Sequence, residues 1–199
     1  GTAWQWTWFV PHQIDGLVEL MGGREGFINK LDSLFTADSS LEGEMTSADI
    51  SGLIGQYAHG NEPSHHIIHM YNYVDQPYKT QELVDSVLHT LYFNDPNGLS
   101  GNEDCGQMSA WYILNAMGFY QVCPGNPVYS IGRPLFNKAT VNLKDGKKFT
   151  VIAKNNSREN KYIQSMVLNG KALDKPFFTH QDIVNGGTLE LTMGDQIKK

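Results

Sequence analysis

The sequence predicts an α+β protein in which helices come first and a β-sheet follows. Up to about residue 119, apolar residues recur at helical spacing. After residue 120 the apolar segments are short, rich in β-branched residues and alternating, and turn residues separate them. Helix and strand patterns segregated in this way are typical of α+β folds rather than of alternating βαβ units. We therefore expect helical hairpins in residues 1–119 and an antiparallel, sandwich-like β-sheet in residues 120–199.

Several segments of the first part have the apolar periodicity of helices. The last of them is apolar nearly all round, so we expect it to be fully buried and to end at Gly118. A polar, irregular stretch, residues 36–63, is long for a connection inside a compact domain, and such loops are usually functional or mobile. The predicted helices are residues 12–23, 23–35, 64–76, 77–93 and 106–118.

The strand-like segments of the second part are separated by turn sequences. Their alternation predicts strands that bury one face. Lys144, Lys147 and Lys148 lie in or beside "KDGKK", which is typical of a solvated hairpin turn. The predicted strands are residues 139–143, 148–154, 162–170 and 188–194.

Charge and composition exclude several kinds of partner. The net charge is -6 and no basic cluster is present, which argues against a nucleic-acid partner. No apolar run approaches the length needed to cross a bilayer, so we expect no membrane partner. Cys105 and Cys123 are too few for a disulfide scaffold, and they either pair or are two buried thiols.

Two acids, Glu103 and Asp104, stand in the turn "GNEDCG" directly before the last predicted helix. Asn102 or Asp104 could cap that helix, because the N–H groups at a helix N-terminus favour a nearby carboxylate. Alternatively, the flanking glycines let the backbone turn sharply and a ligand approach closely. A carboxylate held there could act as a general base or bind a hard cation.

A second polar segment, "HGNEPSHH", gathers His59, Asn61, Glu62, His65 and His66. The spacing is not HExxH, and no second His/Cys cluster completes a zinc site. An oxygen-rich site made of Glu62, Asn61 and backbone carbonyls suits calcium better than a transition metal. The alternative is that Glu62 hydrogen-bonds the loop backbone and that the histidines are packed or solvated.

Three tryptophans, Trp4, Trp6 and Trp8, alternate in "AWQWTWFVPH". Alternating aromatic residues usually pack in a core. In a cleft they stack on the apolar face of a sugar ring, and Gln5 and His12 would offer hydrogen bonds there. The sequence contains no GxSxG, Walker or GxGxxG motif, so serine hydrolase, P-loop and dinucleotide chemistries have no support.

Long stretches of the chain resemble the C-terminal part of the glycoside hydrolase family 92 α-mannosidases. The resemblance is carried by "AWQWTWFVPHQIDGLVELMGG", "HGNEPSHHIIHMYNYVDQPYKTQ", "GNEDCGQMSAWYILNAMGFYQVCPG" and the tail segments "NNSRENKYIQSMVLNGK" and "HQDIVNGGTLELTMG". It implies an exo-acting, calcium-dependent enzyme, exported to the periplasm or outside the cell, that removes α-linked mannose with inversion. The implied substrate is a mannose-containing oligosaccharide or N-glycan, with an α-1,2 linkage expected.

The same resemblance implies an N-terminal β-sandwich and a catalytic α/α toroid. This chain would supply the last hairpins of the toroid and the C-terminal strands, and the rest of the parent chain would be its partner. The family's general acid aligns just before Gly1. We therefore expect this polypeptide alone to be inactive.

The resemblance also implies roles for individual residues. Asp104 matches the general base, whereas Asn102 stands where some members carry a second acid, so Asn102 and Glu103 are supporting candidates. Glu62 and Asn61 are the expected calcium ligands. The expected substrate-binding residues are Trp4, Gln5, His12, Glu62, His65 and Gln107.

Two rival interpretations remain open at this point. One is a non-catalytic carbohydrate-binding or scaffold module built from a helical bundle and a sheet. The other is an α/α-toroid glycosidase that acts on a different sugar, which would share the acid–base logic and differ in its pocket.

Overall fold

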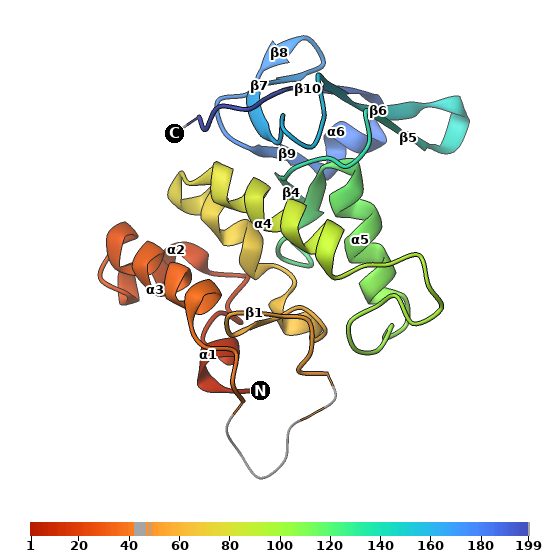
Figure 1. Cartoon of the computed structure of the whole chain (residues 1–199). Helices are drawn as coiled ribbons and strands as arrows, with labels where there is room; N and C mark the ends of the chain where they lie inside the picture. Colours follow the sequence, from red (N-terminus) through yellow and green to blue (C-terminus); the bar gives the residue numbers. More distant parts are fainter. Residues whose placement is uncertain (42–46, 48, 199) are drawn as a thin grey trace.

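The computed structural model describes residues 1–41, 47 and 49–198. Its helices and strands are largely segregated along the chain, as predicted (Figure 1); the exceptions among these residues are a short hairpin of β1 (Leu53–Ile54) and β2 (Tyr57–Ala58) in the first part and short helices in the second. In Figure 1 the helices fill one end of the molecule and the larger sheet lies at the other end. The change from helix to strand falls between α5 and the first strand of the second part, β3; the division into two domains stays a prediction. The helices of the first part are α1 (Ala3–Trp6), α2 (Ile14–Leu20), α3 (Arg24–Thr36), η1 (Glu62–Ser64), η2 (Ile67–Val74), α4 (Pro77–Thr90) and α5 (Gln107–Met117).

Apolar spacing explains how the α-helices pack. In α3 the side chains of Phe27, Leu31 and Leu34 lie on one face and are fully buried. Helix α4 begins with Pro77, which is favourable at the first helical position because its missing N–H has no partner there anyway. Helix α5 ends at Gly118, whose left-handed φ of 103° lets its N–H bond back to the carbonyl groups of the last turn, as predicted.

Two predictions for the helices are wrong. Helix α5 is not fully buried: Trp111 lies in the core, but Ser109 and Ala110 are exposed and Ile113 is 55% exposed. An apolar composition therefore does not mean burial on every side. Instead of the single α-helix expected over residues 64–76, the chain forms two 3₁₀ helices, η1 over residues 62–64 and η2 over residues 67–74. Over eight residues, the sequence pattern does not separate a period of 3.0 from one of 3.6.

The larger sheet has five strands in the order β5-β6-β10-β7-β8. All neighbouring pairs are antiparallel, as predicted, except β6 and β10, which are parallel. Alternation predicts which face of a strand is buried, but it does not encode the partner or its direction. The strands are β5 (Lys138–Asn142), β6 (Lys148–Lys154), β7 (Tyr162–Leu168), β8 (Lys171–Ala172) and β10 (Gly187–Gly194).

A second sheet, which the sequence did not predict, completes the sandwich-like part. Its order is β3-β4-β9, and a short helix, α6, follows β9. The two sheets and α6 enclose one apolar cluster, in which Leu189 and Leu191 of β10 stand opposite Val151 and Ala153 of β6. The bounds are β3 (Phe119–Gln121), β4 (Val128–Ile131), β9 (Phe177–Thr179) and α6 (His180–Val184).

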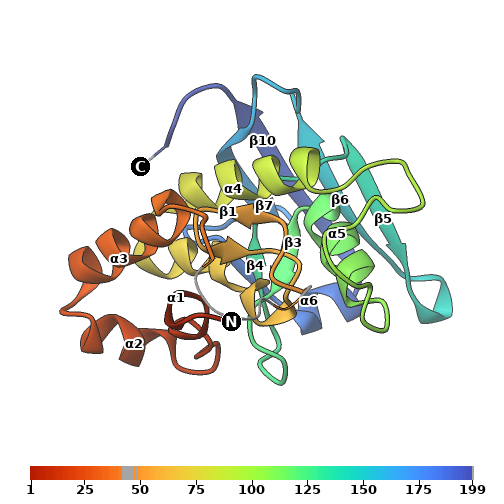
Figure 2. The ribbon, with the colours of Figure 1, turned by 60° about the horizontal axis from the view of Figure 1, so that its bottom comes forward.

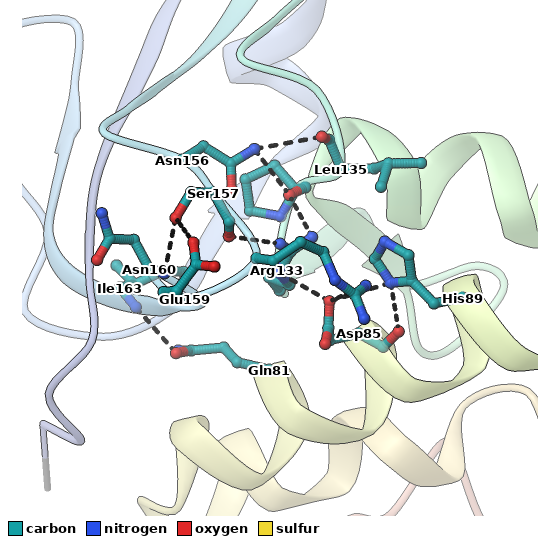
Figure 3. Close-up of polar contacts among 12 residues, drawn as sticks. Gln81, Asp85, His89, Arg133, Leu135, Asn156, Ser157, Glu159, Asn160 and Ile163 are labelled. Carbon is teal, nitrogen blue, oxygen red and sulfur yellow. Dashed lines mark hydrogen bonds and ion pairs between the residues drawn. The ribbon is translucent and has the colours of Figure 1, made fainter.

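A polar joint connects α4 to the strand region (Figure 3). Arg133 is only 2% exposed, and its Nε lies 3.1 Å from Oδ1 of Asp85 on α4. Its Nη2 donates to the carbonyl oxygen of Ser157 at 2.9 Å. Nearby, Gln81 accepts the N–H of Ile163 at 2.9 Å, so α4 is tied to β7 as well.

Neither prediction for the cysteines holds. Cys105 and Cys123 are not paired; Cys105 is exposed and Cys123 is half-buried.

The segment around Asp145 forms a tight, exposed turn between β5 and β6, as the sequence "KDGKK" predicted. No helix of the described residues has the length and apolar character of a membrane-crossing segment.

Candidate active site

Three chain segments come together at one edge of the helical region: residues 49–52, 59–62 and 98–104. The N–H of Gly60 bonds to the carbonyl oxygen of Ser51 at 3.0 Å, and that of His59 bonds to Gly52 at 3.2 Å. A Cβ on Gly60 would collide with Ser51 Oγ, and a Cβ on Gly101 would lie 2.7 Å from the carbonyl oxygen of Gly60. Because glycine alone allows this approach, the glycines bring the polar residues of the three segments side by side.

Glu62 and Asp104, from two of these segments, face each other. Burial raises the pKa of the Glu62 carboxyl, and hydrogen bonding to Asp104 and the negative charges of Asp104 and Asp49 raise it further. Oε1 of Glu62 is buried and has no hydrogen-bond partner among the described residues. Such a pair can share a proton or hold a cation between its oxygens.

The backbone that presents Asp104 is strained. Asp104 and Cys105 have φ angles of 47° and 58°, and Gly106 follows with 88°. Left-handed backbone is uncommon for residues other than glycine, and two in succession persist only when the surroundings hold them. Single left-handed residues also occur elsewhere in the described chain, at Asp75, Asp145, Asn155 and Asn169. The turn that carries Asp104 has two in succession, and strain of this kind concentrates at functional sites.

The capping role predicted for Asn102 or Asp104 belongs instead to Glu103. The N-cap position of α5 is Gly106, which has no side chain. The Glu103 carboxylate accepts the N–H of Ser109 at 2.9 Å and its hydroxyl at 2.8 Å. The adjacent acids therefore have different surroundings: Glu103 binds the helix, and Asp104 faces Glu62.

Asp49 is a member of this cluster that the sequence analysis did not find. Its Oδ1 accepts a hydrogen bond from Nδ2 of Asn102 at 2.8 Å. Asp49 lies in the long polar stretch that was expected to be functional or mobile, but no motif marked it. The only signal was the length of the loop itself.

The aromatic N-terminal segment lies beside the same loops. Figure 2 shows α1 next to the short β1 (Leu53–Ile54) and β2 (Tyr57–Ala58) hairpin. Helix α1 also packs against η1, which begins with Glu62. This arrangement brings the first residues of the chain to the side of the molecule that carries the acids.

Within this segment the tryptophans differ. Trp8 is fully buried against Phe27, Trp6 is 49% exposed, and Trp4 is half-buried with Lys30 Nζ 3.9 Å from its ring centroid. The core interpretation therefore holds for Trp8 and in part for Trp4, which packs against the same apolar core, whereas Trp6 is exposed. Gln5 is 6% exposed, and its Nε2 has no hydrogen-bond partner among the described residues.

His12 is exposed, and no hydrogen bond within the described part of the chain involves its side chain. His65, by contrast, is 1% exposed and lies behind the loops. Its Nε2 bonds to the carbonyl oxygen of His59 at 3.0 Å, and its Nδ1 lies 3.2 Å from Nε2 of Gln107. Burial lowers the pKa of His65 to about 4, so the ring is neutral at pH 7.

Gln107 and Asn61 are half-buried. Gln107 also donates to the hydroxyl of Tyr120 at 3.2 Å, and its carbonyl oxygen accepts no hydrogen bond from the described residues. The substrate roles expected for Trp4, Gln5, His12, Glu62, His65 and Gln107 stay predictions.

The chain matches known proteins over nearly its whole length. A model described as the glycosyl hydrolase family 92 catalytic domain matches residues 1–195. A family GH92 α-mannosidase from Bacteroides thetaiotaomicron has a TM-score of 0.89 and 41% identity, over 98% of this chain and 26% of that chain. The complex of that α-mannosidase with mannoimidazole has a TM-score of 0.91 and 42% identity over the same shares of the two chains.

Two further relatives agree. A family GH92 inverting mannosidase from Bacteroides thetaiotaomicron has a TM-score of 0.84 and 42% identity, over 98% of this chain and 28% of that chain. An uncharacterized secreted glycosidase from Arthroderma benhamiae is 33% identical over 196 residues, which are 97% of this chain and 23% of the relative.

The matched model defines the class of protein as a glycoside hydrolase catalytic domain. The chain belongs to glycosyl hydrolase family 92, as the resemblance of its motifs indicated. It spans about a quarter of the length of the relatives that it matches.

Proposed function

We propose that the chain is part of a longer exo-acting α-mannosidase that releases terminal mannose from oligosaccharides or N-glycans with inversion. The placement of Asp104 supports this most: a carboxylate on a strained turn, beside the partly buried Glu62. Family membership and the α-mannosidase and inverting-mannosidase titles of two relatives support the substrate and the stereochemistry. The helices would be the last hairpins of an α/α toroid, with the sheets after them.

In this proposal Asp104 is the general base. An inverting glycosidase needs a base for the water and an acid for the leaving oxygen, about 6.5–9.5 Å apart. The carboxylate takes a proton from water as the water oxygen bonds to the anomeric carbon, and the bond to the leaving oxygen breaks on the opposite face. The general acid donates a proton to that oxygen, and we assign it to the part of the longer protein before Gly1.

Glu103 cannot share the base role easily, since both of its oxygens are used by Ser109. Asn102 carries no ionisable group. Within the turn, Asp104 is therefore the acid best placed to accept a proton from water.

The residues at Glu62 fit a calcium ion. Its buried Oε1 without a partner is an oxygen donor of the kind that hard cations prefer, and a cation would relieve the repulsion from Asp104. No group of three or more His, Cys, Asp or Glu side chains forms a metal site within the described ranges, so carbonyl oxygens and sugar hydroxyls would complete the shell. Glu62 and Asn61 are the proposed protein ligands, and the bound ion would orient mannose hydroxyls and favour a distorted ring.

The proposed location is the periplasm or the extracellular space. The description of the Arthroderma benhamiae relative as a secreted glycosidase supports export.

The test is to monitor by NMR the release of mannose from α-1,2-linked mannobiose by the full-length protein. Inversion predicts that β-mannose appears first. A chelator should abolish the release, and added Ca²⁺ should restore it. Binding of mannobiose without release would favour a carbohydrate-binding module instead, and release of α-mannose would contradict the inverting mechanism.

A further inference from the structure

The side-chain amide of Asn102 is held from one end. Its Nδ2 donates to Oδ1 of Asp49 at 2.8 Å, across 53 positions of the sequence. The other carboxylate oxygen of Asp49 accepts the hydroxyl of Ser47 at 3.1 Å. Asp49 therefore has both oxygens engaged, one of them by a residue two positions before Asp104.

This contact fixes which way the Asn102 amide is turned. A carboxylate only accepts hydrogen bonds, so the group that faces Asp49 must be the NH₂ group. Oδ1 of Asn102 is then at the other end of the amide, and no hydrogen bond of the described residues ends on it. An acceptor oxygen of fixed direction is left free in the turn that carries Asp104.

Asp49 itself is held where residues 49–52, 59–62 and 98–104 meet, which we call the loop junction. Its carbonyl oxygen accepts the N–H of Ser51 at 2.9 Å, and a Cβ on Gly60 would lie 3.1 Å from the same oxygen. Asp49 is thus packed against the segment that leads into Glu62. The negative charge of Asp49 also raises the pKa of the Glu62 carboxyl.

We infer that Asp49 is a positioning residue of the proposed mannosidase reaction, which orients Asn102 Oδ1 as an acceptor for the water activated by Asp104. A water that attacks carbon must have its lone pair aimed, and two acceptors for its two protons fix that direction. Asp104 supplies one acceptor and takes the proton. Asn102 supplies the other, but only while its amide does not flip.

The inference rests on the proposed function and explains how an asparagine serves at position 102. A carboxylate there offers an oxygen in either orientation. An amide offers one only if something holds the NH₂ group, and Asp49 does so. Asp49 and Asn102 should therefore be coupled energetically in catalysis.

The test is a double-mutant cycle in the full-length protein, with kcat and KM for mannobiose. Asp49→Ala should lower kcat about 10-fold and change KM less than about twofold, because a misdirected water slows the chemical step and leaves sugar binding intact. Asp49→Asn keeps an acceptor for Nδ2 and should retain most of kcat. Asp38→Ala is the matched control, because Asp38 is an exposed acid of the same long loop whose carboxylate, among the described residues, bonds only to Ser40.

The effect of Asn102→Asp should depend on residue 49. With Asp49 present it places two carboxylates in contact, so kcat should fall. With Asp49→Ala it supplies an oxygen in either orientation, so kcat should rise severalfold above the single variant. Melting temperatures of all variants separate catalysis from folding.

Equal kcat for Asp49→Ala and Asp38→Ala, equal effects of Asn102→Asp in both backgrounds, or Asp49→Asn as impaired as Asp49→Ala would each overturn the inference while the mannosidase function stands. A wild-type protein that releases no mannose would overturn the proposed function and the inference together.

Discussion

The larger sheet and the loop junction differ in how well their side chains and backbone satisfy local preferences. In β6 and β10, buried side chains alternate with half-buried or exposed ones, and apolar partners stand opposite each other in register. At the junction, by contrast, Glu62 Oε1 and Ser51 Oγ are buried without partners among the described residues, and Asp104 and Cys105 have left-handed backbone. The arrangement in the sheet stabilises the fold. The arrangement at the loop junction destabilises it locally and leaves polar groups available for a ligand.

The difference teaches where to look for function in this chain. A region in which every local preference agrees with the fold is built for stability. The junction violates several preferences at once, in side chains and in backbone. The strained backbone is held in place by the helical core beneath it, in which Tyr57 and Trp111 are fully buried.

The largest expected effect on stability lies at the joint between the two regions. Arg133→Ala would leave Asp85 as a largely buried charge without its closest cation, which typically costs about 3–5 kcal/mol of unfolding free energy. Urea denaturation of the full-length protein measures this cost. Arg158→Ala is the matched control, since that side chain is 62% exposed and 3.7 Å from Asp85. Equal losses for the two variants would show that the buried pair does not join the regions.

Acid should loosen the helical region before the sheet. Burial lowers the pKa of His65 and His69 to about 4, so both are neutral when folded and protonate near pH 6.5 when unfolded. The unfolded state therefore binds more protons between pH 6.5 and 4. Stability falls as the pH falls through that window, by at most about 1.4 kcal/mol per pH unit for each histidine.

Hydrogen exchange at pH 7 and pH 5, corrected for intrinsic rates, measures this difference. Peptides covering η2 should lose protection, while those covering β6 should keep it. Equal losses in both would mean that the buried histidines do not set the acid response.

A smaller effect is expected at Glu103. Glu103→Gln keeps one acceptor for Ser109 but removes the charge at the start of α5, so we expect a cost of about 0.5–1 kcal/mol. Thermal unfolding measures it. No change in stability would mean that the hydrogen bonds to Ser109 contribute nothing to the helix.

The sequence predicts the regular elements well, because apolar spacing is a local property. The helices α3, α4 and α5 and the strands β5, β6, β7 and β10 lie where their patterns placed them. The short strands β3, β4 and β9 were missed because three or four residues carry too little periodicity. The parallel pairing of β6 with β10 depends on chain topology, which no local pattern encodes.

The candidate site was predicted in part. Motif resemblance pointed to Glu62 and Asp104, and folding brings the two together. Sequence reasoning could not tell which acid caps α5, since that depends on the backbone angles of residues 104–106. It also missed Asp49, because a single acid in a polar loop has no pattern until Asn102 meets it in space.

The central claim is that the adjacent acids have different tasks, with Glu103 capping α5 and Asp104 acting as the base. The most direct measurement compares kcat of the full-length Asp104→Asn and Glu103→Gln variants on α-1,2-linked mannobiose, well below their melting temperatures. The account predicts a loss of about 10²-fold or more for Asp104→Asn and less than about threefold for Glu103→Gln. Full activity of Asp104→Asn, or an equal loss in both variants, would contradict it.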